Sequence, residues 1–150
     1  MEATGPLEPC RNGIHACYLD DLPHWIGPEL WTIEIEGEVQ PAPNGVLARR
    51  GRLLQRIEKW ADSVAREFAE DCARRAQSLA GETAVVADRA ADAVANAVSG
   101  WISASAYIAA VVAGQVNSGS AEGPLYERHF LTERARQAAW LQERLELAQG

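Results

Sequence analysis

The sequence predicts an α+β protein in which a short N-terminal two-stranded β-unit precedes three helices that form an antiparallel bundle. Residues before about 45 are rich in proline, glycine and tryptophan and include one strictly alternating stretch. The later residues are rich in alanine and arginine, and their apolar side chains recur at spacings of three and four. A chain of 150 residues that is 47% apolar and 23% charged has the size and composition of one soluble domain. We therefore divide it into a β-unit at 1–45 and a helical region at 46–150, packed together as one compact domain.

Two strands are predicted within the β-unit. Asn12-Gly13 is a turn signal before a short strand at 14–18, and Asp20 can begin a single helical turn at 21–25. The segment WTIEIEGEV at 31–39 alternates apolar and polar side chains, which predicts a strand with one acidic, solvated face. Residues 41–45 interrupt the chain, and we identify no third strand. The opposite face, expected to be buried against the helices, carries Trp31, Ile33, Ile35 and Val39.

Three helices are predicted at 47–80, 83–117 and 124–148. The first has an apolar stripe, Gly81 can end it, Thr83 can cap the second helix, and Pro124 suits the first turn of the third. Residues 93–116 carry no charge and are long enough to span a bilayer, but their many alanines and polar side chains favour a helix inside the bundle. Short connections favour antiparallel neighbours. The stripe of the first helix consists of Leu53, Ile57, Trp60, Val64, Phe68 and Cys72.

Three segments, PCRNGIHAC, DLPHWIGPELWTIEIEGEV and ARRGRLLQRIEKW, resemble an uncharacterised family of actinobacterial proteins. Members of that family share a Gly-(Ile/Leu)-His-Ala-Cys segment, an Asp-Leu-Pro-x-Trp turn, a Glu-Leu-Trp-x-x-Glu strand and a following Arg-Gly-Arg-Leu. The resemblance covers residues 5–60. It implies that the family has a further N-terminal strand region that this chain lacks, which would agree with the missing third strand. The resemblance implies lineage and no activity.

The segment from Glu8 to Trp25 concentrates side chains that could bind a metal or act in catalysis. Cys10, His15, Cys17 and His24 supply four thiol and imidazole ligands, the number that a tetrahedral zinc site requires. Zinc sites usually pair cysteines two to four residues apart, and this spacing is longer. A catalytic cysteine would also need an oxyanion-binding loop, and no glycine-rich loop of that kind is visible. We therefore expect a small buried thiol and a hydrogen-bonded histidine, with no metal and no cofactor.

Arg49, Arg50, Arg52 and Arg56 form a basic group that we place at the start of the first helix. Positive charge at the N-terminus of a helix interacts unfavourably with the helix dipole, so we expect these arginines to have anionic partners. Two possibilities are open, namely the acidic face of the strand at 31–39 and an external anion such as phosphate. The net charge of −7 argues against a nucleic-acid partner.

Two classes of function follow from these observations. The first is a non-enzymatic soluble protein that binds a protein partner or forms a homo-oligomer. The second is a small metal-binding protein or an enzyme that uses the segment from Cys10 to His24. The opening residues show no secretory signal and the chain has three cysteines, so we expect reduced thiols and a cytoplasmic location. We favour the first class, and we expect neither a nucleic acid nor a membrane as the partner.

Overall fold

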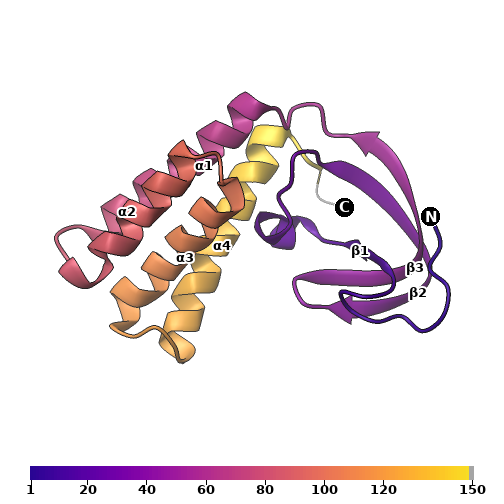
Figure 1. The fold of residues 1–150 in the computed structure, drawn as a ribbon, viewed down its shortest axis with the longest axis horizontal. Helices are drawn as coiled ribbons and strands as arrows, with labels where there is room; N and C mark the ends of the chain where they lie inside the picture. Colours follow the sequence, from indigo (N-terminus) through magenta and orange to yellow (C-terminus); the bar gives the residue numbers. More distant parts are fainter. Residues whose placement is uncertain (149–150) are drawn as a thin grey trace.

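The computed structural model describes residues 1–148 as an α+β fold in which an antiparallel three-stranded sheet lies beyond one end of four α-helices (Figure 1). The predicted α+β class and the predicted strand at 31–39 are confirmed. The short strand and the helical turn of the N-terminal segment are also present. The elements are β1 (Ile14–Ala16), the 3₁₀ helix η1 (Leu19–His24), β2 (Trp31–Ala42), β3 (Gly45–Arg56), α1 (Asp62–Ala80), α2 (Ala84–Val98), α3 (Ile102–Ser118) and α4 (Pro124–Leu145).

Residues 45–56 form a strand where the sequence predicted the first turns of a helix, and the prediction of two strands is wrong. β3 is the central strand of the sheet, whose order is β1-β3-β2, and it runs antiparallel to both neighbours. The predicted interruption at 41–45 is a tight turn through Pro43 and Asn44. Asn44 has a φ of 55°, a left-handed conformation that asparagine tolerates better than most residues. The sheet therefore continues past residue 45 to Arg56.

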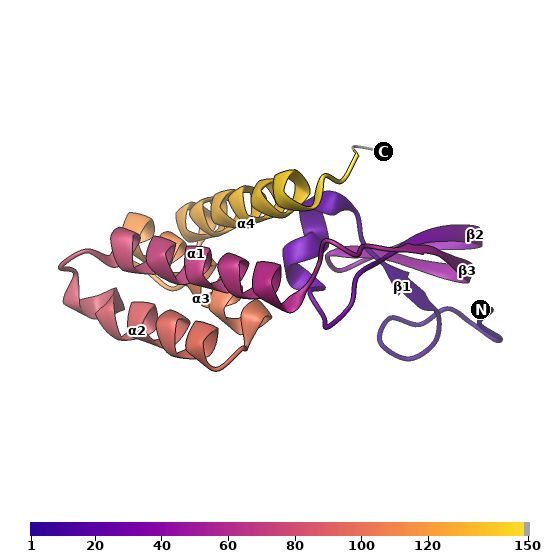
Figure 2. The same ribbon diagram turned by 90° about the horizontal axis from the view of Figure 1, so that it is seen from above.

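The helical region contains four α-helices, so the prediction of three is also wrong. α1 begins at Asp62, and the predicted second helix is divided into α2 and α3 at Ser99-Gly100-Trp101. Gly100 has a φ of 78°, which glycine adopts without the steric penalty of a side chain, and the chain reverses there. Successive helices run antiparallel (Figure 2). Among residues 1–148, no helix is both long and apolar enough to span a bilayer.

Small side chains allow the helices to pack closely around one core. Phe68 and Cys72 of α1 are fully buried, as the predicted stripe requires, and Val64 is nearly so. They meet alanine-rich faces of α2 and α3, where the short side chains bring the helix backbones together. Leu141 and Leu145 of α4 complete the core.

η1 connects the sheet to the bundle by packing on α4 and α3 (Figures 1 and 2). Leu22 of η1 and Leu30 of the following loop are buried with the helix core. On the neighbouring side, the indole Nε1 of Trp60 donates a hydrogen bond to the Gly27 carbonyl at 2.9 Å. The connections before and after the sheet are therefore held to the same end of the bundle.

The apolar face of β2 is less buried than the alternation of its sequence predicts. Ile33 and Ile35 are half-buried, whereas Trp31 and Val39 are 41% and 44% exposed. The long strands curve away from the helix ends, and η1 lies between the sheet and α4 (Figure 1). The expected packing of this face on the helices is therefore incomplete, and part of an apolar surface stays open.

Replacing Trp60 by alanine should lower the free energy of unfolding by about 3–5 kcal/mol, because its indole fills core volume and bonds to the η1–β2 connection. Urea denaturation followed by circular dichroism measures this change. Val85→Ala is the matched control, since Val85 is 86% exposed on α2. Equal denaturation midpoints for the two variants would contradict the position of Trp60 in the core.

Candidate functional site

A groove lies between the apolar face of the sheet and η1, beside Leu147 and Ala148 of the chain segment that follows α4. Its volume is about 580 Å³. We call it the aromatic groove, because three aromatic rings from separate positions surround it. β2 and β3 position its sheet side, and the segment from β1 to η1 positions the other. Its main lining residues are His15, Cys17, Tyr18, Leu22, Trp25, Trp31, Ile33, Leu53 and Leu147.

Hydrogen bonds hold two of the three aromatic side chains of the groove, Trp25 and Trp31. Tyr18 is 65% exposed, and Trp25 and Trp31 are each 41% exposed. The indole of Trp25 donates to the carbonyl of Asn44 in the β2–β3 turn, and that of Trp31 donates to Glu29 Oε2 at 3.2 Å. These bonds orient the rings while leaving much of their apolar surface in solvent. The sequence pattern assigned Trp31 to a buried face and gave no indication of the exposure of the other two rings.

His15 and Cys17 both line the aromatic groove, where Cys17 is half-buried. His15 Nε2 accepts a hydrogen bond from the Cys10 backbone N–H at 3.2 Å, and its ring lies 5.9 Å from that of Trp25. Burial, together with a smaller effect of the Asp21 carboxylate, raises the pKa of the Cys17 thiol to about 11. Cys17 is therefore a neutral thiol at pH 7, whereas a nucleophilic cysteine would need a thiolate.

His24 points to the bundle and takes part in a different set of contacts. Its Nδ1 lies 3.0 Å from Nη2 of Arg134 on α4. Burial, and then the Arg134 guanidinium, lower the pKa of His24, while Asp21 opposes this effect. His24 therefore serves the contact between η1 and α4.

The four candidate ligands do not come together as a metal site. Cys10 is exposed beside the N-terminal turn, His15 and Cys17 face the groove, and His24 faces Arg134. Within residues 1–148, no three histidine, cysteine, aspartate or glutamate side chains are grouped closely enough to hold a metal ion.

The four candidate arginines lie on β3 rather than on a helix. The register of the hairpin places Arg52 opposite Glu34 and Arg50 opposite Glu36, with ion-pair distances of 2.7 and 3.9 Å. Their arrangement agrees with the first of the two possibilities, an internal acidic partner. The other two pairs are Arg49–Glu38 at 2.6 Å and Arg56–Glu29 at 3.2 Å.

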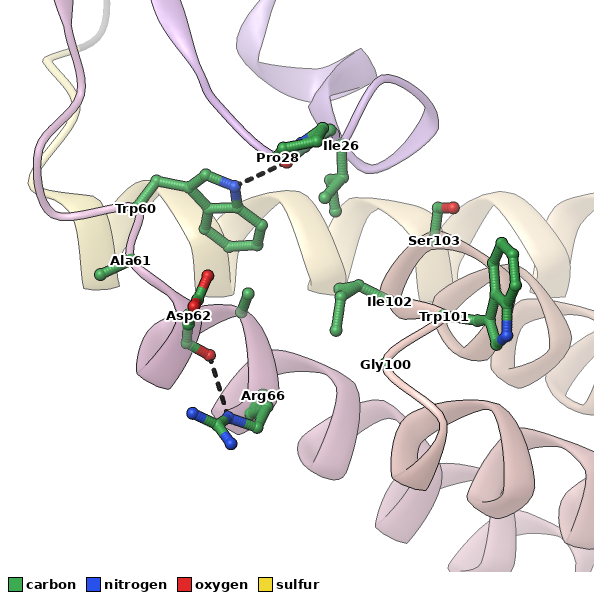
Figure 3. Close-up of a pocket in the computed structure, with 12 residues that line it drawn as sticks. Ile26, Pro28, Trp60, Ala61, Asp62, Arg66, Gly100, Trp101, Ile102 and Ser103 are labelled. Carbon is green, nitrogen blue, oxygen red and sulfur yellow. Dashed lines mark hydrogen bonds between the residues drawn. The ribbon is translucent and has the colours of Figure 1, made fainter.

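A second cavity lies where the η1–β2 connection meets the beginnings of α1 and α3 (Figure 3). Its volume is about 560 Å³. Trp60 and Ile26 line one side, and Trp101, which is 67% exposed, lies across from them. The charged side chains in its lining are those of Asp62 and Arg66, and Arg66 Nε donates to the Asp62 backbone carbonyl within α1. Compared with the aromatic groove, this cavity presents fewer exposed aromatic rings, and we assign it no role in binding.

The Glu34–Arg52 pair should contribute roughly 0.2–1 kcal/mol to the stability of the hairpin. Glu34→Arg and Arg52→Glu should each destabilise it, and the double variant should recover most of the loss because the charges are exchanged. A double-mutant cycle measured by urea denaturation gives the coupling energy. Glu82→Arg, at the exposed α1–α2 turn, is the control for a change of net charge. Additive single-variant effects would contradict the cross-strand pairing.

The three thiols should react in order of decreasing exposure, with Cys10 first, Cys17 second and Cys72 last. At pH 7.5, Cys10 should react first with a chromogenic disulfide, because it is exposed. Cys17 should react slowly, because its raised pKa leaves little thiolate, and Cys72 should react only on unfolding, because burial raises its pKa to about 12. Absorbance kinetics with single Cys→Ser variants assign each phase. A fast phase that disappears in Cys17→Ser would restore the hypothesis of a reactive cysteine.

Comparison of the chain with protein-family models, with curated proteins and with solved structures finds no match in any of the three. The resemblance to an actinobacterial family across residues 5–60 accordingly stays a prediction from the sequence.

Proposed function

We propose that the protein is a non-enzymatic interaction protein that binds an apolar segment of a partner protein in the aromatic groove. The observation that carries this proposal is the exposure of Tyr18, Trp25 and Trp31, by 41–65%, around one cavity. Aromatic side chains supply much of the binding energy at protein interfaces, because they bury a large area for few rotatable bonds. Leu53, which is 48% exposed on β3, extends the same apolar surface.

The groove is better suited to a peptide segment than to a small polar ligand. Its volume of about 580 Å³ could admit either. A small-molecule site usually has several convergent polar groups that fix the ligand's orientation, whereas apolar side chains predominate here. The three rings also keep 41–65% of their surface exposed, so a bound chain could contact them over an extended surface.

The charges near the groove favour a partner segment that carries basic residues beside its apolar side chains. Glu29 lines the groove, where it is paired with Arg56, and Asp21 lies close enough to Cys17 to affect its pKa. The whole chain has a net charge of −7, which would attract a cationic segment over a longer distance. Complementary charge of this kind increases the rate of association more than the final affinity.

The chemistry of the groove gives little support to the alternative of an enzyme or a metal-binding protein. The thiol of Cys17 is neutral, and His15 accepts a backbone hydrogen bond instead of activating that thiol. We extend the proposal to a cytoplasmic location, since all three cysteines are unpaired.

Selection from a library of random 12-residue peptides should enrich sequences with two or more large apolar residues flanked by lysine or arginine. Affinities of the selected peptides are measured by fluorescence anisotropy. Trp31→Ala and Leu53→Glu should weaken binding about tenfold or more, as expected when a central interface side chain is removed. Both positions are exposed, so circular dichroism should show unchanged folding.

The matched control is Trp101→Ala, which removes an equally large exposed ring at the α2–α3 turn. It should leave peptide affinity unchanged. Equal losses in Trp31→Ala and Trp101→Ala, or no enrichment at all, would argue against the groove as the binding surface. The alternative occupant of the groove is a second copy of the chain, and sedimentation velocity on the free protein tests it. A dimer in the wild type that becomes a monomer in Leu53→Glu would mean that a second copy covers the groove.

A further inference from the structure

Arg134 is a buried cation without an acidic partner. It is only 4% exposed, and among the described residues it forms no ion pair. One guanidinium nitrogen donates to Gln137 Oε1 at 3.0 Å, and another lies 3.0 Å from His24 Nδ1. The guanidinium also lies 5.8 Å from the ring centres of Tyr107 and Phe130. Its Nε is buried and has no hydrogen-bond partner.

The contact with Arg134 defines the protonation state of His24. A guanidinium only donates hydrogen bonds, so the Nδ1 atom of His24 must be an acceptor and the imidazole must be neutral. A proton on Nδ1 would remove this hydrogen bond, because an N–H group of His24 would then face an N–H group of Arg134. It would also place two cations 3.0 Å apart in a half-buried position.

The other groups around His24 do not compensate for this repulsion. On η1 itself, Asp21 favours the protonated form, but its effect is smaller than those of burial and Arg134. α3 contributes only Tyr107 as a titratable group, since the rest of Ile102–Ser118 is uncharged. On α4, Glu133 is already bonded to Arg75 and Arg136. On α1, burial raises the pKa of Cys72 to about 12, so its thiol stays neutral.

We propose that protonation of His24 releases η1 from α4 and thereby opens one wall of the aromatic groove, so that partner binding is lost at mildly acidic pH. Leu22 and Trp25 are part of that wall, and they lie within and directly after η1. The consequence for binding rests on the proposed function, whereas the release of η1 does not.

The direction of the pH dependence follows from proton linkage. Docking lowers the pKa of His24 below its ordinary value of 6.5, so the released state binds a proton more tightly than the docked state. Docking is therefore strongest above pH 6.5 and weakens as the pH falls from 6.5 through the lowered value. Each unit of difference between the two pKa values allows about a tenfold shift in the docking equilibrium.

The release is tested by nuclear magnetic resonance on the isotope-labelled full chain between pH 8 and 4.5. The ring signals of His24 should titrate with a midpoint below 6.5, and the backbone signals of η1 and of α4 around Arg134 should change with the same midpoint. In His24→Gln, which keeps an acceptor but does not titrate, the η1 signals should be independent of pH. His129→Gln, on α4 and outside the groove, is the matched control and should retain the transition.

Three results would overturn the release of η1. They are a His24 midpoint at or above 6.5, η1 signals that do not change while His24 titrates, and a transition that persists in His24→Gln. The first two come from the wild-type protein and decide the question even if the variant does not fold.

The affinity of a groove-binding peptide, measured at pH 7.5 and 5.5, tests the link to binding. It should fall at pH 5.5 in the wild type and stay constant in His24→Gln. Release of η1 at acidic pH with unchanged peptide affinity would overturn only the link to binding. Release of η1 in a protein that binds no peptide at any pH would contradict the proposed function but not the pH-dependent release.

Discussion

The docking of η1 on α4 and α3 is the constraint on which the rest of the structure depends. The sheet meets the helices mainly through this short element and through its connecting segments, since the faces of β2 and β3 make few contacts with the bundle. Leu22 anchors η1 in the helix core, and the Trp60–Gly27 hydrogen bond holds the next part of the chain to the start of α1. The aromatic groove exists because these contacts keep η1 opposite the curved sheet.

The buried polar residues of α4 give this docking its specificity. Alanine-rich helix faces pack closely but distinguish poorly between neighbouring registers, because one methyl group resembles the next. Glu133 and Gln137, exposed by 3% and 0%, bond to Arg75, Arg136 and the Ala106 carbonyl. A buried polar group loses free energy when its partner is missing, so only one placement of α4 satisfies all of these bonds. Arg134 extends the same requirement to His24 and hence to η1.

Local periodicity was enough to predict the fold class, β2 and the core stripe of α1. It failed at β3, because the helical spacing of Val64 and Phe68 in α1 also fits residues that precede the helix. These residues are Leu53, Ile57 and Trp60, of which Leu53 belongs to a strand. The missed signal lay in the charges. Arginines at alternate positions, 50 and 52, complement the alternating glutamates of β2, a pattern that a hairpin explains and a helix does not. For the same reason the sequence predicted one helix in place of α2 and α3, because the apolar spacing continues across the turn at Gly100.

The aromatic groove could not have been predicted from the sequence, because Tyr18, Trp31, Leu53 and Leu147 meet only once the hairpin has curved over η1. What the sequence did indicate is that the face of β2 carrying Trp31 and Ile33 should be covered by apolar surface. The bundle cannot cover it, because η1 already lies between the sheet and α4. The chain thus presents an alternating strand whose apolar side is only partly buried, and burying the rest would be favourable.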